Sequence, residues 1–239
     1  MKQKIFNKFK DVEKGHLWND FKMYSSVCIY DTLDEESFDY VVSNIDKIKQ
    51  QALEITFDIN NSSILDKAKK MDFAPDYHWY IYNISENDKK LDLDNNIKIV
   101  KKRKIVKDQL VAQMHELAQR EPNMFDKNGA ARDWYKSGKE CIAYIEGKEI
   151  VSVLTWQYEP QNNNIHIYLT YTQPEYRSKG YNSKLFDYIK KYAFEHNIKT
   201  ITVCTDVTDK NRVPNMFFKN GFKYFKTGFE KIIKQRGKL

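Results

Sequence analysis

The chain has 239 residues, of which 41% are hydrophobic and 14% aromatic. This apolar content is too high for a disordered chain, and the length suits one large domain or two small ones. No run approaches the roughly 18 to 20 apolar residues of a membrane-spanning helix. The first 15 residues are basic but include Asp11 and Glu13, and no apolar stretch follows them. They do not resemble a secretory signal, so we expect a cytoplasmic protein with no membrane partner.

The formal net charge of +7 is unevenly distributed along the chain. Residues 1–96 carry 13 Lys and Arg against 18 Asp and Glu, whereas residues 97–239 carry 27 against 15. The positive field therefore belongs to the C-terminal part, whose partner is expected to be anionic.

Three cysteines, Cys28, Cys141 and Cys204, lie far apart, each within an alternating apolar run. This pattern is typical of buried thiols on strands. Because no CxxC motif and no histidine cluster accompanies them, we expect neither a metal site nor a disulfide framework.

The N-terminal part contains a possible echo of the C-terminal part. Residues 52–84 parallel residues 200–232, with a similar spacing from Asp58 to Phe73 and from Asp206 to Phe222. Such self-similarity favours two related folds in tandem. A polar linker at residues 86–96 then places a domain boundary near residue 95, which gives domains 1–95 and 96–239.

A basic run follows the linker at residues 98–108. Its alternation of apolar and charged residues favours a strand with a solvated face over a nucleic-acid-binding arm. Asp108 stands where a helix N-cap would, ahead of apolar residues at helical spacing, and a second short helix is predicted over residues 128–136. Trp134 and Tyr135, in these helices, either touch substrate or belong to the core, and the core is favoured.

Three strands are predicted next, followed by a turn and a helix. Two hydrophobic runs flank the turn Glu146-Gly147-Lys148, and a third ends just before Pro174, which indicates an antiparallel meander. After the turn, the pattern predicts a helix, a strand, a helix that ends at Asn220-Gly221, and a last strand.

The turn after the third strand, PEYRSKGYNSKLF, raises the question of phosphate binding. A turn that opens directly into a helix leaves backbone N–H groups unpaired at the positive end of the helix dipole. Gly180 permits a close approach or a positive φ, and Arg177 and Lys179 add positive charge. By itself this pattern favours an ordinary strand-to-helix connection, because such connections are common in α/β domains.

Its surroundings resemble a known family. The turn is similar to the acetyl-CoA signature R/Q-x-x-G-x-G/A of the GNAT N-acetyltransferase superfamily. The order of elements over residues 97–233 and the segment FFKNGF before the last strand resemble that family too. The resemblance implies an α/β (mixed α+β) fold, a GNAT-like mixed sheet flanked by helices. The repeat implies a smaller, truncated GNAT-like α/β domain before it.

The resemblance also implies a CoA site in a V-shaped opening between the third meander strand and the strand after the signature helix. Backbone groups of Tyr171, Thr172 and Gln173 would pair with the pantetheine arm, and amides of residues 179–183 would hold the pyrophosphate. The implied contacts of acetyl-CoA are Tyr171, Thr172, Gln173, Arg177, Ser178, Lys179, Gly180, Tyr181, Asn182, Ser183, Asn211 and Phe217.

Two positions depart from the family pattern. Asn182 stands where the family prefers Gly or Ala, so its side chain could crowd the phosphate or donate a hydrogen bond to it. Phe217 and Phe218 lie where many members carry a tyrosine that protonates the departing thiolate. A phenyl ring cannot donate a proton, so water, another tyrosine or no general acid serves.

For the general base, counting back from Arg177 leads to His166, whose ordinary pKa of about 6.5 suits proton removal near neutrality. Tyr168 shares its strand face and is a candidate partner. The alternative is a solvent-facing histidine on a strand. Glu116 and Glu121 are weaker candidates, because helical carboxylates usually face water.

The expected activity is transfer of an acetyl group from acetyl-CoA to a primary amine of a small molecule or peptide, by direct attack in a ternary complex and without a metal. The alternative is a catalytically inert regulator that binds acyl-CoA or a macromolecule. Nucleic-acid binding by the basic part is disfavoured but stays open.

In the N-terminal unit, the helix start with Asp34, Glu35 and Glu36 would repel a phosphate, so no CoA site is expected there. That unit is expected to pack beside the acceptor groove or to mediate a homodimer.

Overall fold

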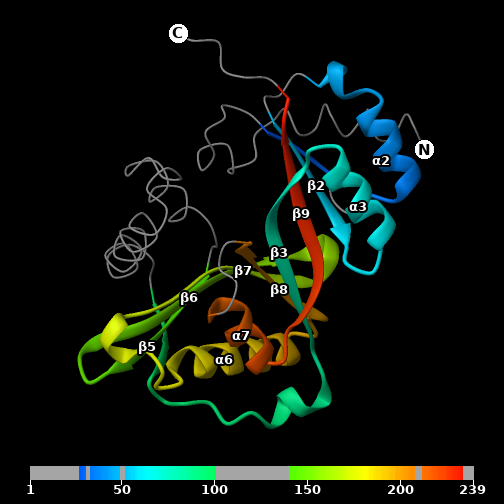
Figure 1. Ribbon diagram of the computed structural model, residues 1–239. Helices are drawn as coiled ribbons and strands as arrows, with labels where there is room; N and C mark the ends of the chain where they lie inside the picture. The colour runs from blue at the N-terminus through cyan, green and yellow to red at the C-terminus, as the bar shows by residue number, and fades with distance from the viewer. Residues whose placement is uncertain (1–26, 31–32, 49–51, 101–139, 208–211, 234–239) are drawn as a thin grey trace. The chain divides into compact units, whose positions relative to one another are not determined.

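The structure is a computed structural model that describes residues 27–30, 33–48, 52–100, 140–207 and 212–233. The chain divides into two compact units, one of residues 1–79, 205–213 and 224–239, the other of residues 80–204 and 214–223. Each unit is a layer of mixed strands with helices packed on it (Figure 1). This is the mixed α/β class that the sequence predicts.

The first unit begins with β1 (Val27–Tyr30), α2 (Glu35–Val42), a 3-10 turn η2 (Ile45–Lys47), β2 (Ala52–Asp58) and α3 (Ser62–Lys70). The strands β3 (Ala74–Asn83) and β9 (Lys223–Ile232) complete it. The strand order is β1-β2-β9-β3, with β1 parallel to β2 and β2 antiparallel to β9.

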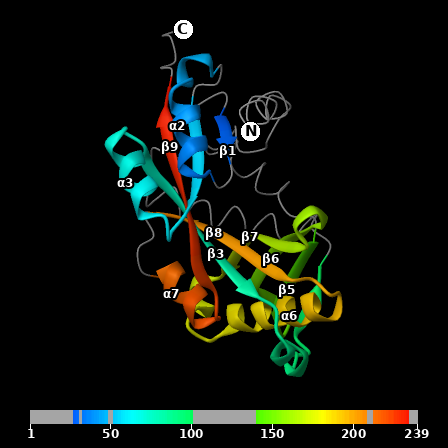
Figure 2. The same ribbon diagram turned by 90° about the vertical axis from the view of Figure 1, so that its right-hand side faces the viewer.

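Alternation along β2 decides which face of the first unit is buried. Ile55 pairs with Phe229 of β9, and both belong to an apolar core that α2 and α3 cover. In Figure 2 the two helices lie beside β2 and β9. The fully or almost fully buried members of this core are Phe38, Val41, Ile48, Leu53, Ile55, Phe57, Ile64, Ala68, Phe73 and Phe229.

The second unit holds the predicted meander. After a 3-10 turn η3 (Glu86–Lys90) and β4 (Ile97–Ile99) come the strands β5 (Glu140–Glu146), β6 (Glu149–Glu159) and β7 (Asn164–Thr172), with η4 (Pro160–Asn162) before β7. Strands β4 to β7 are antiparallel neighbours. The meander is confirmed.

The chain continues through η5 (Pro174–Tyr176), α6 (Tyr181–Glu195), β8 (Thr200–Asp206) and α7 (Arg212–Lys219). In this unit the strand order is β3-β8-β7-β6-β5-β4, and β8 is parallel to β7. The apolar face of α6, with Leu185, Phe186, Ile189 and Ala193, is buried, as its helical spacing predicts.

The two units do not coincide with the segments 1–95 and 96–239, because the last strands are exchanged. The elements β2, α3 and β3 repeat the order of β8, α7 and β9. Yet β2 pairs with β9, and β8 has β3 as its neighbour. Each unit is therefore completed by a strand from the other half of the sequence. A tandem GNAT-like origin of the first half stays a prediction.

The cysteines match the expectation in part. Cys141 on β5 is buried, whereas Cys204 on β8 is only half-buried. The side chain of Cys28 and the helices predicted over residues 108–136 lie outside the described residues. Trp134, Tyr135, Glu116 and Glu121 belong to that segment.

Candidate functional site

The strands β7 and β8 pair over only part of their length. Parallel pairing joins residues 164–167 of β7 to residues 200–203 of β8. Beyond Ile167, β7 continues to Thr172 along β6, and the described residues of β8 have no recorded pairing with it. The resemblance implied an opening between these two strands, and the end of their pairing lies where that opening would begin.

A β-bulge lies where the two strands part. Thr155 of β6 pairs with Leu169, but the next residue, Trp156, pairs with Ile167, so Tyr168 is the additional residue of β7. Bulges bend a strand and increase its twist. The bulge therefore accounts for the separation of β7 from β8 after Ile167.

Alternation along β7 identifies which backbone groups lie on its free edge. The N–H of Gln173 donates to the carbonyl of Val151 on β6, 3.0 Å away, and the carbonyl of Gln173 accepts from Tyr176 N–H at 3.0 Å. Both backbone groups of Gln173 thus have partners within the protein, which counts against its pairing with a pantetheine arm; that pairing stays a prediction. Since backbone groups alternate in direction, those of Thr170 and Thr172 point away from β6.

Thr170 is a candidate contact that the sequence reasoning missed. The alternation of strand hydrogen bonds would have found it, but only with the β6–β7 register known. The backbone of Thr172 already has one partner, a side chain, because the carbonyl of Thr172 accepts from Arg177 Nε at 3.1 Å. The carbonyl of Tyr171 accepts from Ser152 Oγ at 3.0 Å.

The turn between β7 and α6 presents a series of backbone donors. Within the described part of the chain, the N–H groups of residues 178–183 have no recorded hydrogen-bond acceptor. Ser178 and Gly180 have positive φ, 65° and 81°, and Gly180 is the N-cap of α6 without a side-chain cap. These amides lie at the positive end of a 15-residue helix.

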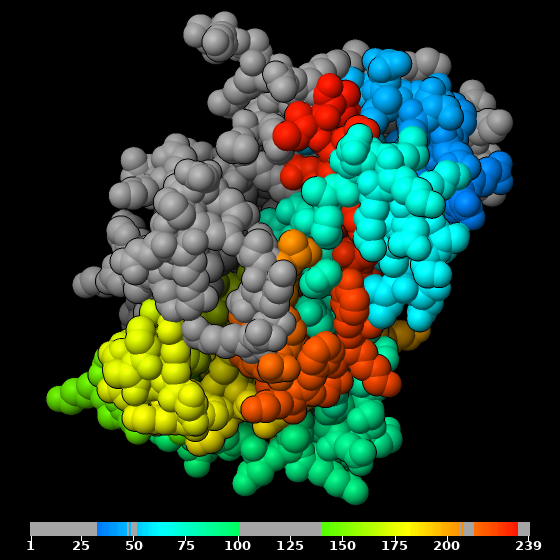
Figure 3. Space-filling model, in the orientation of Figure 1, coloured from blue at the N-terminus to red at the C-terminus, as the bar shows by residue number. Residues whose placement is uncertain are grey.

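Space is open in front of the N-cap. A Cβ built on Gly180 would meet no atom within 4 Å, so glycine is required here by its backbone conformation and not by crowding. In Figure 3 the yellow atoms, the turn and the start of α6 among them, lie at the surface. Six amides, open space and nearby cations together fit a pyrophosphate.

The basic side chains of the turn have partners within the protein. Besides its bond to Thr172, Arg177 lies over the ring of Tyr171, with Cζ 5.8 Å from the ring centroid. Lys179 Nζ lies 4.7 Å from the ring centroid of Tyr176, whose hydroxyl donates to Glu149 at 2.9 Å. Phosphate recognition in this geometry depends first on the backbone, with Lys179 as nearby countercharge.

A polar cluster fastens the first turn of α6. Lys184 Nζ donates to Asp94 Oδ2 at 2.7 Å and to the Tyr144 hydroxyl at 3.1 Å, and that hydroxyl also donates to Asp94 Oδ2. The bond from Lys184 is the main cause that lowers the pKa of Asp94 to about 2. Lys184 is thereby held to the protein and does not add free charge to the turn.

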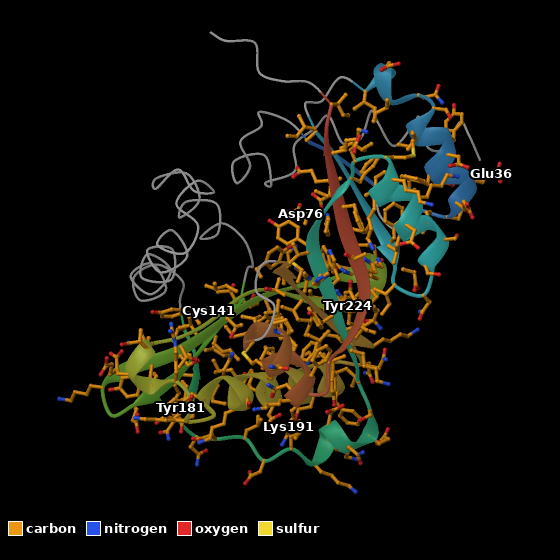
Figure 4. The ribbon with its side chains drawn as sticks, viewed as in Figure 1. Glu36, Asp76, Cys141, Tyr181, Lys191 and Tyr224 are labelled. Carbon is orange, nitrogen blue, oxygen red and sulfur yellow. The ribbon has the colours of Figure 1, made fainter. Side chains whose placement is uncertain are left out.

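Tyr181, the first residue of α6, is fastened as well. Its hydroxyl donates to Glu146 Oε2 at 2.8 Å, and its ring lies 4.5 Å from that of Tyr144. Figure 4 labels Tyr181 at the start of α6. No pattern in the sequence predicts this cluster, because Asp94 belongs to the stretch we interpreted as a linker.

The side chain of Asn182 is directed into the protein. Its Oδ1 accepts from the Thr170 hydroxyl, and its Nδ2 lies 2.7 Å from Met216 Sδ on α7. Both ends of the amide are therefore engaged. The concern that this side chain would crowd a phosphate is not supported, and the departure from Gly or Ala has a structural reason.

His166 is buried, with 4% of its surface exposed, so the alternative of a solvent-facing histidine is wrong. Burial lowers the pKa of His166 to about 4. Its Nδ1 lies 3.0 Å from Thr202 Oγ1, and its ring meets that of Tyr168 edge-on at 4.7 Å. Burial also raises the pKa of Tyr168, which therefore carries its proton at neutral pH. The role of His166 as a base stays a prediction, and its low basicity counts against it.

A further polar group lies on the same face of the sheet as His166. Gln157 pairs with His166, and Thr155, two residues away on β6, shares its face. The hydroxyl of Thr155 is buried and has no hydrogen-bond partner. Buried hydroxyls are usually paired, so this one is available to a bound polar group.

Phe217 lies in the core. It is 1% exposed, and its ring lies 6.2 Å from Phe186, 5.9 Å from Phe222 and 5.0 Å from Tyr80. This aromatic cluster packs α7 onto α6 and explains the apolar residue at this position. A contact of Phe217 with the cofactor stays a prediction. Asn211 lies outside the described residues.

The start of α2 in the first unit differs from the start of α6. There Asp34 is the N-cap, and its Oδ1 accepts from Ser37 N–H at 2.8 Å. Glu35 and Glu36 follow in the first turn. Carboxylates at a helix start disfavour a bound anion, and the expectation that the first unit holds no CoA stays a prediction.

The strands and helices of the two units define a mixed α/β fold, with a candidate phosphate-binding turn between β7 and α6. The solved structures show the same fold at low sequence identity. A functionally unknown conserved protein from Staphylococcus epidermidis is 15% identical, with a TM-score of 0.55 over 91% of this chain and 89% of that one. A GCN5-related N-acetyltransferase from Sphaerobacter thermophilus is 10% identical, with a TM-score of 0.52 over 86% and 68%.

An acetyltransferase from the GNAT family of Colwellia psychrerythraea is 12% identical, with a TM-score of 0.50 over 82% of this chain and 71% of that one. A search of the curated proteins finds no match. The model of the acetyltransferase (GNAT) family matches residues 110–222. Residues 110–222 are therefore similar to the GNAT acetyltransferase family, and this similarity supports acyl transfer in general. The family match does not extend to the N-terminal unit.

None of the helices in the described residues has the length and apolar character to cross a bilayer. The described residues also contain no group of three or more His, Cys, Asp or Glu side chains placed to hold a metal ion.

Proposed function

We propose that the protein transfers an acetyl group from acetyl-CoA to a primary amine by direct attack within a ternary complex. The observation that carries the proposal is the series of unpaired amides at residues 178–183, ahead of α6 and beside open space. Because the family match includes this turn, an anion held by these amides is interpreted as the pyrophosphate of CoA.

The residues of this chain would bind and orient the reactants. The amides of the turn fix the diphosphate, and the free edge of β7 at Thr170 and Thr172 offers the arm backbone partners, in the manner of an added strand. The thioester supplies the acyl group. A backbone N–H on this edge would donate to the thioester carbonyl oxygen, which gains charge as the amine attacks.

The acceptor is a small-molecule or peptide amine. The face that carries His166, Tyr168 and the unpaired hydroxyl of Thr155 is adjacent to the parting of β7 and β8, so we assign the acceptor to that face. Three neutral groups there can exchange hydrogen bonds with polar groups of the acceptor.

The test measures binding and turnover separately. Acetyl-CoA at about 100 times its Kd should stabilise the protein by roughly 2.7 kcal/mol, seen as a rise in Tm. Release of CoA, corrected for hydrolysis, is then followed with a panel of polyamines, amino acids, aminoglycosides and peptides. An unchanged Tm at millimolar acetyl-CoA would refute the proposal.

The second candidate is a catalytically inert regulator that binds acyl-CoA. The packing of Phe217 favours it, because the position expected for the general acid holds a buried phenyl ring. Tight binding of acetyl-CoA without turnover on any amine of the panel would support this candidate.

A further inference from the structure

A series of side-chain hydrogen bonds connects β6, β7 and β8 at the N-terminal end of β7, where β7 pairs with β8. Asn164 Nδ2 lies 3.0 Å from Glu159 Oε2 and 2.8 Å from Thr202 Oγ1. Thr200 Oγ1 donates to Asn164 Oδ1 at 2.9 Å, and Thr202 Oγ1 lies 3.0 Å from His166 Nδ1. This series of hydrogen bonds ends at His166, the general base predicted from the sequence.

The carboxylate of Glu159 fixes the direction of these bonds. An ionised carboxylate only accepts, so the amide group of Asn164 that faces it must be the NH₂. The reversed amide would place two oxygens against each other and would also lose the bond from Thr200. Asn164 therefore donates to Thr202.

The hydroxyl of Thr202 has one hydrogen, and its position follows. The oxygen accepts from Asn164, and the only other recorded partner of this hydroxyl is His166 Nδ1. If Nδ1 carried a hydrogen, the hydrogen of Thr202 would have no recorded acceptor among the described residues. The hydroxyl accordingly donates to Nδ1, which carries no hydrogen.

The imidazole is neutral at physiological pH. His166 is 4% exposed, and burial lowers its pKa to about 4. Among the described residues, the ring of Tyr168 on β7 contacts His166, and Asn164 stands between His166 and the carboxylate of Glu159 on β6. Glu159 and Cys204 on β8 act electrostatically on Tyr168. A neutral imidazole without hydrogen on Nδ1 carries its hydrogen on Nε2.

We propose that His166 is a positioning residue held in the Nε2–H form, and that it is not the general base. A base needs a bare nitrogen facing the acceptor, but Nδ1 is bonded to Thr202, and Nε2–H can only donate. The bond from β8 to His166 lies one residue before Ile167 and Val203, the last pair of the two strands. It holds the strands together where they part and supports the ring of Tyr168.

The tautomer is tested by NMR of the full chain with ¹⁵N-labelled histidine, and this test needs no activity. His196 is a built-in control of opposite type, because its Nδ1 lies 2.8 Å from the carbonyl of Tyr192 and must donate to it. We expect a bare Nδ1 and a protonated Nε2 for His166, unchanged from pH 5.5 to 8, and a protonated Nδ1 for His196. A protonated Nδ1 on His166, or its titration in this range, would overturn the proposal.

The positioning role rests on the proposed function and is tested by kinetics. His166→Gln keeps an N–H near the position of Nε2 but cannot act as a base. We expect it to retain most of the turnover with an unmoved pH–rate profile, whereas His166→Ala loses about tenfold, the equivalent of one hydrogen bond. Equal and severe loss in both variants, with the acid-side inflection of the pH–rate profile removed, would identify His166 as the base.

The NMR test and the kinetic test distinguish failure of the proposed tautomer from failure of the proposed function. If no amine is acetylated, the proposed function fails, while the NMR spectrum still decides the tautomer. Thr202→Val gives a second check on the hydrogen-bond chain, because it removes the hydroxyl and keeps the shape. We expect its spectrum to show a mixture of the two neutral tautomers of His166, one with hydrogen on Nδ1 and one with hydrogen on Nε2. A spectrum identical to that of the unchanged protein would contradict the assignment.

Discussion

Replacement of Gly180 by alanine should separate the stability of the turn from its ability to bind CoA. Gly180 has a φ of 81°, and a Cβ there would meet no atom within 4 Å. The substitution therefore changes the free energy of folding only through the backbone conformation of residue 180. The left-handed conformation costs about 1–2 kcal/mol for an L-residue. Reduced freedom of the unfolded chain offsets about 0.4–1 kcal/mol of this, so a net loss of about 1 kcal/mol is expected.

The effect on CoA should be larger. The added methyl group enters the open space in front of the amides of residues 178–183, where the diphosphate is proposed to lie. Loss of one hydrogen bond to a charged group costs about 1.5–3 kcal/mol. That free energy corresponds to binding weaker by about tenfold to 100-fold.

Gly147→Ala is the matched control. Gly147 has a φ of 63° and equally open surroundings, but it lies in the hairpin turn between β5 and β6. Both variants should lose the same stability in urea unfolding. By isothermal titration, only Gly180→Ala should lose affinity for CoA. Equal affinity in the two variants would refute the assignment of the phosphate to this turn.

Three further changes test other parts of the structure. Asp94→Asn should lower the free energy of unfolding at pH 7 by about 1 kcal/mol or less. Because the pKa of Asp94 is depressed to about 2, this contribution is present above pH 4 and is lost as pH falls through 2, so acid titration should show the two proteins converging. Asn182→Ala should cost about 1 kcal/mol from its bond to Thr170 and leave CoA affinity within twofold by titration; a larger loss of affinity would place the amide on the phosphate. A fragment of residues 96–239 lacks β3, one of the two neighbours of β8, and both neighbours of β9, so it should show no cooperative unfolding by circular dichroism until residues 1–95 are added; independent folding would contradict the strand exchange.

The sequence predicted those parts of the fold that depend on local patterns. The alternation of residues 140–172 gave the meander, and the arginine, glycine and helix start of residues 177–185 gave the turn. The cap at Asp34 was also correct, because capping is decided within three or four residues. These features involve no partner that is distant in the sequence.

Features that depend on distant pairing were not predicted. The exchange of β3 and β9 requires knowledge of which edge strand reaches which neighbour, and alternation along each strand is the same in either arrangement. Likewise, the pairing of β6 with β7 decides that the backbone groups of Thr170 and Thr172, and not those of Gln173, point away from β6, and this register was not known from the sequence. His166 was placed on the correct strand, but its burial and its bond to Thr202 are tertiary properties.

The exchanged last strand also bears on how the protein folds during synthesis. β2 is made early, yet its antiparallel partner β9 ends at Ile232. At about 5–20 residues per second, β2 waits on the order of ten seconds or more for that partner. Until then it has β1 on one side and an unpaired edge on the other, which is a site for wrong pairing between nascent chains. Folding of the first unit therefore has to wait until β9 has left the ribosome, although β1, α2, β2 and α3 are made much earlier.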